Sequence, residues 1–168
     1  TGRMGVVVPH GVLFRGSTEG KIRQQLIEEN LLDTVIGLPE KLFFGTGIPA
    51  AILIFKKQKS DDKVLFIDAS HAFKSNKNQN QLTKENIKDI IDAFKARKNQ
   101  DKYSYLATKE EIAENDYNLN IPRYVDTFEK EAEINLDEVR DERLTLQKQL
   151  KELEVEMEGY FKELGYGS

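Results

Sequence analysis

Four apolar runs divide the first part of the chain and predict the strands of a sheet. Residues Met4–Phe14 (MGVVVPHGVLF) are apolar at successive positions, as expected for a strand covered on both faces. Pro9 cannot donate a hydrogen bond to a neighbouring strand, so we expect this strand to end there. Three further runs, Asp33–Leu38, Ile48–Phe55 and Lys63–Asp68, predict three more strands.

Amphipathic spacing predicts helices between and after these strands. Ser17 or Thr18 can cap a first helix, and Thr83 opens a second. Thr108 and Glu111 form a capping box for a short third helix. The apolar positions expected on the inner faces are Ile22, Leu26 and Ile27 in the first helix and Ile87, Ile90, Ile91 and Phe94 in the second.

Two polar or irregular segments separate the later elements. Ser75–Gln81 (SNKNQNQ) predicts a mobile loop without a function of its own. Asp116–Val125 (DYNLNIPRYV) reads as irregular chain. In this segment Arg123 and Tyr124 could contact a phosphate or a neighbouring subunit, although we favour a role in fixing the segment to the domain.

The pattern changes to heptads from about Leu136 onward. Eight of the nine core heptad positions are apolar, which predicts a helix of about 30 residues and roughly 45 Å. Such a stripe needs a cover, which is either this chain's own core or another chain. The interface candidates are Leu146, Leu150, Leu153, Met157, Tyr160 and Leu164.

These elements predict an α/β fold whose sheet is mixed. Residues 1–70 would form the sheet, residues 71–126 a helical and loop extension, and residues 127–168 a long amphipathic helix. The connection from Leu38 to Ile48 would join an antiparallel pair at the edge of the sheet. An unpaired edge favours dimerisation, so a homodimer is one expectation.

Composition narrows the possible chemistry. The chain has no cysteine, which excludes disulfides and thiolate catalysis. Its two histidines, His10 and His71, lack partners at ligand spacing, so we expect no metal site and treat His10 as a polar turn residue. Neither a secretory signal nor a membrane-length apolar run is visible, which favours a cytoplasmic protein without membrane contact.

Charge is distributed unevenly along the chain. Residues 127–168 hold 6 basic and 12 acidic side chains, whereas the rest holds 19 and 17. The overall pI of about 5.4 argues against this chain gripping DNA unaided, because phosphate contacts need clustered Lys and Arg.

The segment 38–57 (LPEKLFFGTGIPAAILIFKK) is the most informative part of the sequence. A pair of aromatic residues, Phe43 and Phe44, leads into a Gly-Thr-Gly-Ile-Pro turn and then a strand. Glycines beside a flat ring allow positive φ and close backbone approach, so a planar ligand could stack there. The simpler interpretation is a hairpin whose two aromatic side chains belong to the core.

With the preceding GRMGVVVPHGVLF, this segment resembles the modification (M) subunit of type I restriction–modification systems. These subunits are N6-adenine DNA methyltransferases that use S-adenosylmethionine. The resemblance spans roughly residues 2–126 and implies the back half of a Rossmann-like methyltransferase sheet. It also implies that the C-terminal helix docks onto the specificity (S) subunit of a complex that includes a restriction subunit and binds double-stranded DNA.

The resemblance assigns one principal site residue, Phe44, which would stack on the flipped target adenine. Pro9, Gly45, Thr46 and Gly47 are the candidates for lining the pocket beside it. Phe43 is expected to be a core residue.

The sequence lacks the parts of this family that perform the chemistry. It contains neither the Asn/Asp-Pro-Pro-aromatic motif that holds the adenine amine nor the Gly-rich turn that binds the cofactor. Both lie upstream in the family order, as an N-terminal truncation would predict. We therefore expect no catalytic residue here, no S-adenosylmethionine bound to this chain alone, and no activity without the rest of the subunit. The alternatives are a non-catalytic assembly module and an unrelated α/β domain with a coiled-coil tail.

Overall fold

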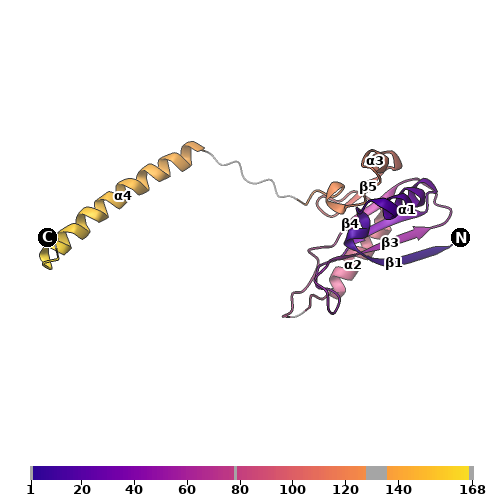
Figure 1. The fold of residues 1–168 in the computed structure, drawn as a ribbon, viewed down its shortest axis with the longest axis horizontal. Helices are drawn as coiled ribbons and strands as arrows, with labels where there is room; N and C mark the ends of the chain where they lie inside the picture. The colour runs from indigo at the N-terminus through magenta and orange to yellow at the C-terminus, as the bar shows by residue number, and fades with distance from the viewer. Residues whose placement is uncertain (1, 78, 128–135, 167–168) are drawn as a thin grey trace. The chain divides into compact units, whose positions relative to one another are not determined.

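A computed structural model describes the chain except residues 1, 78, 128–135 and 167–168. The chain forms two compact units, Thr1–Phe128 and Glu129–Ser168 (Figure 1). Each is considered by itself. No helix in the described part of the chain is long and apolar enough to cross a membrane.

The first unit is built on a mixed five-stranded sheet with the order β1-β3-β2-β4-β5. β2 and β4 are parallel, and the three other neighbouring pairs are antiparallel. This is the mixed α/β sheet that the sequence predicts. The strands are β1 (Arg3–Pro9), β2 (Leu32–Gly37), β3 (Ala50–Lys56), β4 (Val64–Asp68) and β5 (Ser104–Ala107).

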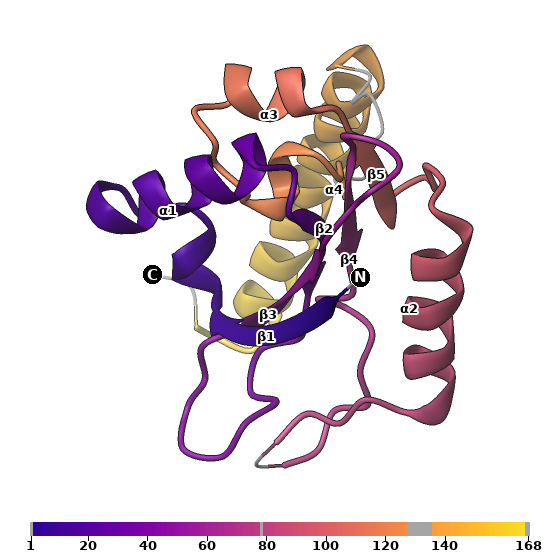
Figure 2. The same ribbon diagram turned by 90° about the vertical axis from the view of Figure 1, so that its right-hand side faces the viewer.

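Helices cover both faces of this sheet (Figure 2). α1 (Ser17–Glu28) and α3 (Lys109–Glu114) lie over one face, and α2 (Lys84–Ala96) lies over the other. Successive strand residues point to opposite faces, so Phe66 joins the cluster under α1 and α3, whereas Leu65 and Ile67 join the cluster under α2. Short 3-10 turns at His10–Leu13 and Ile121–Arg123 complete the first layer.

The first strand differs from the expectation of a strand covered on both faces. β1 ends at Pro9, as predicted, but it lies at the edge of the sheet and most of its residues are exposed or half-buried. The predicted antiparallel pair β2–β3 is present, yet it lies inside the sheet because β1 pairs with the outer side of β3. The apolar run therefore predicts the strand correctly but does not predict its position at the edge of the sheet.

The first helix buries a charged residue where an apolar one was expected. Ile22 is 53% exposed, whereas Arg23 is 6% exposed. The Arg23 guanidinium donates hydrogen bonds to the backbone oxygens of Val12 (2.8 Å) and Tyr117 (3.1 Å), which satisfies the buried cation. Arg23 thus fixes α1 against the turn that follows β1.

In the second helix, only part of the apolar face that the sequence predicts packs against the sheet. Ile90 and Phe94 pack against the cluster under α2, but Ile87 and Ile91 are exposed. Thr83 and Asn86 form a reciprocal cap at its start, so the predicted beginning of this helix is confirmed.

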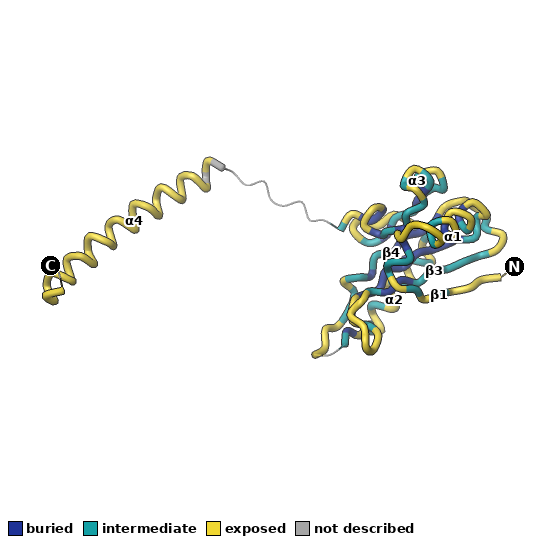
Figure 3. The backbone as a smooth tube through the Cα atoms, in the orientation of Figure 1, coloured by how far each residue is buried: buried dark blue, intermediate teal, exposed yellow. Residues whose placement is uncertain are grey.

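The second unit consists of α4 (Leu136–Glu163), the long helix that the heptads predict. The side chains described in it are exposed along its length (Figure 3). The six interface candidates are each more than half exposed. They follow one another at intervals of four and three residues and so form one stripe.

Candidate functional site

The first feature of the site is the turn between β2 and β3, which bears the paired aromatic residues. Leu38 N–H donates to Ala50 O at 2.9 Å and closes the base of this turn. Near its tip, Ile48 N–H donates to Thr46 Oγ1 at 3.1 Å. Gly45 has a φ of 74°, a left-handed conformation that residues with a side chain rarely adopt. Gly47 does not have a positive φ.

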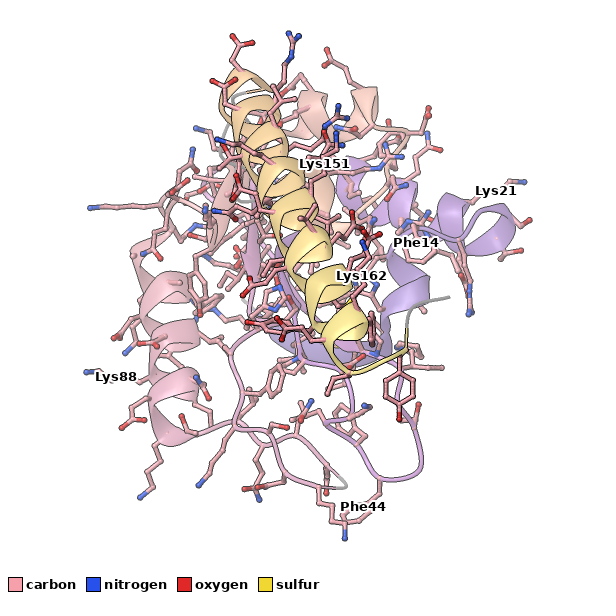
Figure 4. The ribbon with its side chains drawn as sticks, turned by 90° about the vertical axis from the view of Figure 1, so that its left-hand side faces the viewer. Phe14, Lys21, Phe44, Lys88, Lys151 and Lys162 are labelled. Carbon is pink, nitrogen blue, oxygen red and sulfur yellow. The ribbon has the colours of Figure 1, made fainter. Side chains whose placement is uncertain are left out.

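The two aromatic side chains lie outside the core. Phe44 is 88% exposed and Phe43 is 43% exposed. Phe44 is labelled at the tip of the turn in Figure 4. The interpretation of either residue as a core residue is therefore wrong. The Phe44 ring is therefore open to stacking and contributes little to the stability of the domain.

An apolar cavity of about 220 Å³ lies beside this turn. Its size lies below the range of drug-sized pockets. Of the residues expected to line a pocket, Pro9 and Thr46 do so, whereas Gly45 and Gly47 do not. The lining residues are Val7, Val8, Pro9, Phe43, Thr46, Ile48, Pro49 and Ala50.

The direction of the strands explains why these parts meet. β1, β2 and β4 run the same way, because both β1 and β2 are antiparallel to β3 and β2 is parallel to β4. Their carboxyl ends therefore lie at one edge of the sheet, the usual place for ligands in open α/β folds. The aromatic turn and the loop after β4 both project from that end (Figure 2).

The loop after β4 is joined to the aromatic turn by hydrogen bonds. Asn80 donates through Nδ2 to Glu40 O at 2.9 Å and through its backbone N–H to Lys41 O at 2.8 Å. Gln79 Nε2 donates to Leu42 O at 2.7 Å. Asn80 is only 6% exposed. Contrary to the expectation of a mobile loop, this part of it is hydrogen-bonded to the turn.

His10 follows directly on the last residue of β1. Its backbone N–H donates to Pro49 O at 3.0 Å, and its ring meets Phe14 edge-on at 5.8 Å between centroids. Burial lowers the pKa of His10, and the nearby Asp68 carboxylate opposes that shift. His10 is thus favoured as a neutral ring that packs at the end of β1.

The segment 116–125 is fixed to the domain by Tyr124. Its ring stacks on Phe66 with 3.9 Å between centroids, and its hydroxyl donates to Asn118 O at 2.6 Å. Burial raises the pKa of Tyr124 to about 12. The favoured role of this residue, to lock the segment onto the core, is confirmed. Arg123 is exposed, with a long contact of 3.4 Å to Asn115 Oδ1.

Comparison with known proteins decides the family. A family model described as N-6 DNA methylase matches residues 1–133. The chain belongs to the N-6 DNA methylase family. The reading as an unrelated α/β domain is therefore wrong, and the resemblance to type I M subunits is confirmed by the relatives below.

Among the curated N-6 methylase relatives is the type I restriction enzyme MjaVII methylase subunit of Methanocaldococcus jannaschii. It is 37% identical over 164 residues, which are 94% of this chain and 28% of that protein. The MpnII methylase subunit of Mycoplasma pneumoniae is 31% identical over 90% of this chain and 30% of its own length. The chain thus spans about three tenths of the length of these curated relatives.

Solved structures give the same fold. The type I methyltransferase subunit from Streptococcus thermophilus is 57% identical and matches with a TM-score of 0.74 over 76% of this chain and 27% of its own. A structure solved in work on complex assembly and conformational transition of the type I system covers 99% of this chain and 36% of its own, with a TM-score of 0.57. At 19% identity that second likeness shows the fold alone.

The residues around the cavity do not fit the cofactor that the N-6 methylase family implies. S-adenosylmethionine carries an amino group, a carboxylate and ribose hydroxyls, which require polar or charged partners. The eight lining residues include no charged side chain, and Thr46 is their one side-chain hydroxyl. In the described part of the chain, no group of three acidic or histidine residues could hold a metal ion.

Sequence reasoning missed two features of the first unit. β5 consists of only four residues, and its two-residue alternation gives little signal. The Asn80 anchor lies in a run of polar residues, and its Glu40 partner is 40 positions away. No local pattern in the sequence could have predicted the strand β5 or the hydrogen bond from Asn80 to Glu40.

Proposed function

We propose that this chain is the C-terminal portion of a type I restriction–modification DNA adenine-N6 methyltransferase subunit. In this proposal it supplies the wall on which the target base stacks, together with a docking helix. The observation that carries the proposal is the exposed Phe44 ring on a turn at the carboxyl edge of the sheet. The methylase family membership gives the reaction in which such a ring would act.

The physical role of the ring follows from the substrate. An adenine inside a duplex cannot reach a methyl donor, so it must leave the base stack. Leaving the stack costs a few kcal/mol, and stacking on an aromatic side chain recovers about 1–3 kcal/mol. The apolar cavity beside Phe43, Pro9 and Thr46 would shield one edge of the extruded base from water.

The remaining chemistry belongs to the rest of the parent subunit. There, S-adenosylmethionine would supply the methyl group, and an Asn/Asp-Pro-Pro-aromatic motif would hold the adenine amine. The residues lining the cavity in this chain offer no charged partner for S-adenosylmethionine, and the sequence contains no Asn/Asp-Pro-Pro motif. We therefore expect the chain alone to be inactive.

The second part of the proposal concerns assembly. Within the second unit, the stripe of six apolar residues on α4, from Leu146 to Leu164, is exposed. A stripe at heptad spacing is the surface that packs against partner helices. We propose the specificity subunit as this partner, with the restriction subunit and double-stranded DNA joined through the complex.

A homodimer is a competing use of the same chain. β1 pairs with β3 on one side only, and Met4 and Val7 on this edge strand are exposed. Exposed edge strands pair readily with other strands. Sedimentation of this chain, with and without the specificity subunit, would separate self-association from assembly.

Two measurements test the proposal. Calorimetric titration of this chain with S-adenosylmethionine should show no tight binding, and tight binding would overturn the division of labour stated above. In the complete subunit, Phe44→Ala should slow methylation and alter the fluorescence of 2-aminopurine at the target position. If both stay at their wild-type values, the stacking role is wrong.

A further inference from the structure

The loop after β4 holds three consecutive backbone carbonyls of the aromatic turn. These are the carbonyls of residues 40, 41 and 42, which accept from Asn80 Nδ2, Asn80 N–H and Gln79 Nε2 at 2.7–2.9 Å. Phe44 follows only two residues later. The loop therefore holds the part of the turn that comes just before the exposed ring.

The held backbone is of a kind that needs support. Lys41 has φ of 53°, a left-handed conformation that residues other than glycine rarely adopt. Such a conformation persists where surrounding contacts over-determine it, and it is concentrated near functional sites. The hydrogen bond from Asn80 N–H to Lys41 O and the neighbouring bond to Glu40 O provide that determination.

Asn80 is the buried member of the pair that holds the turn. A buried polar side chain is favourable only when it is hydrogen-bonded, and Asn80 is 6% exposed. Its amide group uses its donor on Glu40 O, and the loop around it is closed by the backbone pair Lys74–Gln81. Asn80 thus connects the loop after β4 to the aromatic turn through two hydrogen bonds.

We propose that Asn80 and Gln79 are positioning residues, which hold the aromatic turn in the orientation that allows Phe44 to stack on a flipped base. The inference rests on the proposed stacking role of Phe44. Neither residue touches the base. Their effect is to reduce the freedom that the turn must lose when the base arrives, which raises the fraction of subunits ready to stack.

The test uses the complete subunit, assembled with its specificity subunit, on a duplex containing its recognition sequence. Asn80→Asp keeps the shape of the side chain but removes the donor to Glu40 O. It should lower kcat/KM by about 2- to 13-fold, the range that the net contribution of one hydrogen bond represents. Gln79→Ala, a milder change, should lower it in the same direction.

A double-mutant comparison distinguishes positioning from general damage. If Asn80 acts through the ring, Asn80→Asp in the Phe44→Ala background should change the rate by less than about twofold. The single variants Asn80→Asp and Gln79→Ala should each shift 2-aminopurine fluorescence in the same direction as Phe44→Ala. The matched control is Asn76→Asp in the same loop, because Asn76 contacts Gln81 and not the turn. It should leave the rate and the fluorescence unchanged.

The outcomes separate this inference from the proposed function. If Phe44→Ala slows methylation but Asn80→Asp and Gln79→Ala do not, the positioning role is wrong and the stacking role stands. An equal effect of Asn80→Asp with and without Phe44 also overturns it. If Phe44→Ala itself has no effect, the stacking role and this inference both fail. Should Asn80→Asp not fold, as judged by circular dichroism, Gln79→Ala decides.

Discussion

Replacing Phe44 by alanine should separate activity from stability, because the ring is exposed. A buried aromatic side chain removes about 200 Å² from water, and at 88% exposure Phe44 removes only about 25 Å². At about 25 cal/mol per Å², its truncation should lower the free energy of unfolding by only about 0.6 kcal/mol. Loss of base stacking, by contrast, should lower kcat/KM about 5- to 150-fold.

The neighbouring Phe43 provides the comparison. It is 43% exposed and so removes about 110 Å² from water. Phe43→Ala should therefore lower the free energy of unfolding by up to about 2.8 kcal/mol, several times the effect at Phe44. The two residues are adjacent in sequence, so the contrast tests the exposure of each ring rather than the general sensitivity of the turn.

The assay is urea unfolding of this chain, followed by far-ultraviolet circular dichroism, with methylation measured separately in the complete subunit. Equal slopes against urea for the wild type and both variants would show that the comparison is one of stability alone. A loss above about 1.5 kcal/mol for Phe44→Ala would show that the ring is packed against the domain, and the reasoning from its exposure would fail.

Three further predictions concern other parts of the chain. Tyr124→Phe removes the donor to Asn118 O and should lower the free energy of unfolding by about 1–2 kcal/mol, and titration of tyrosine absorbance should show Tyr124 ionising near pH 12. The pKa of His10 lies below its ordinary 6.5, so the unfolded chain binds the proton first and stability falls as pH drops below about 6.5. His10→Gln should therefore reduce the loss of melting temperature between pH 7.5 and pH 5, and an unchanged loss would contradict this. Leu150→Asp should prevent co-purification with the specificity subunit, whereas Val155→Asp, on the opposite side of α4, should not.

The parts of the fold that the sequence predicts well are those whose signals are local. β4 begins with four successive apolar residues, β2 contains the apolar pair Val35–Ile36, and the start of α2 carries its own cap at Thr83. β1 has the same apolar character but lies at an edge, and its sequence cannot reveal which strand lies beside it. Local pattern thus gives the strand and its end at Pro9, while its place in the sheet is a long-range property.

The site divides in the same way. The aromatic turn is recognisable because its residues are contiguous and resemble a family motif. Pro9 and Thr46 line the same cavity because the directions of the strands bring their ends to one edge of the sheet. Phe43 was misassigned to the core since a sequence of two aromatics does not show which ring is covered. The anchor at Asn80 depends on a contact across 40 positions, which composition alone represents as an ordinary polar loop.

An exposed ring is useful for stacking only if the turn that bears it is already ordered. Fixing one residue's backbone costs about 1–2 kcal/mol, which is comparable to the stacking energy of a single base. If the turn ordered only when the base arrived, that cost would cancel much of the gain. Here three carbonyls before Phe44 are already hydrogen-bonded, and the base of the turn is closed between Leu38 and Ala50. The ordering is therefore supplied by the folded domain, and in the proposed stacking role of Phe44 most of the stacking energy would remain to hold the extruded adenine.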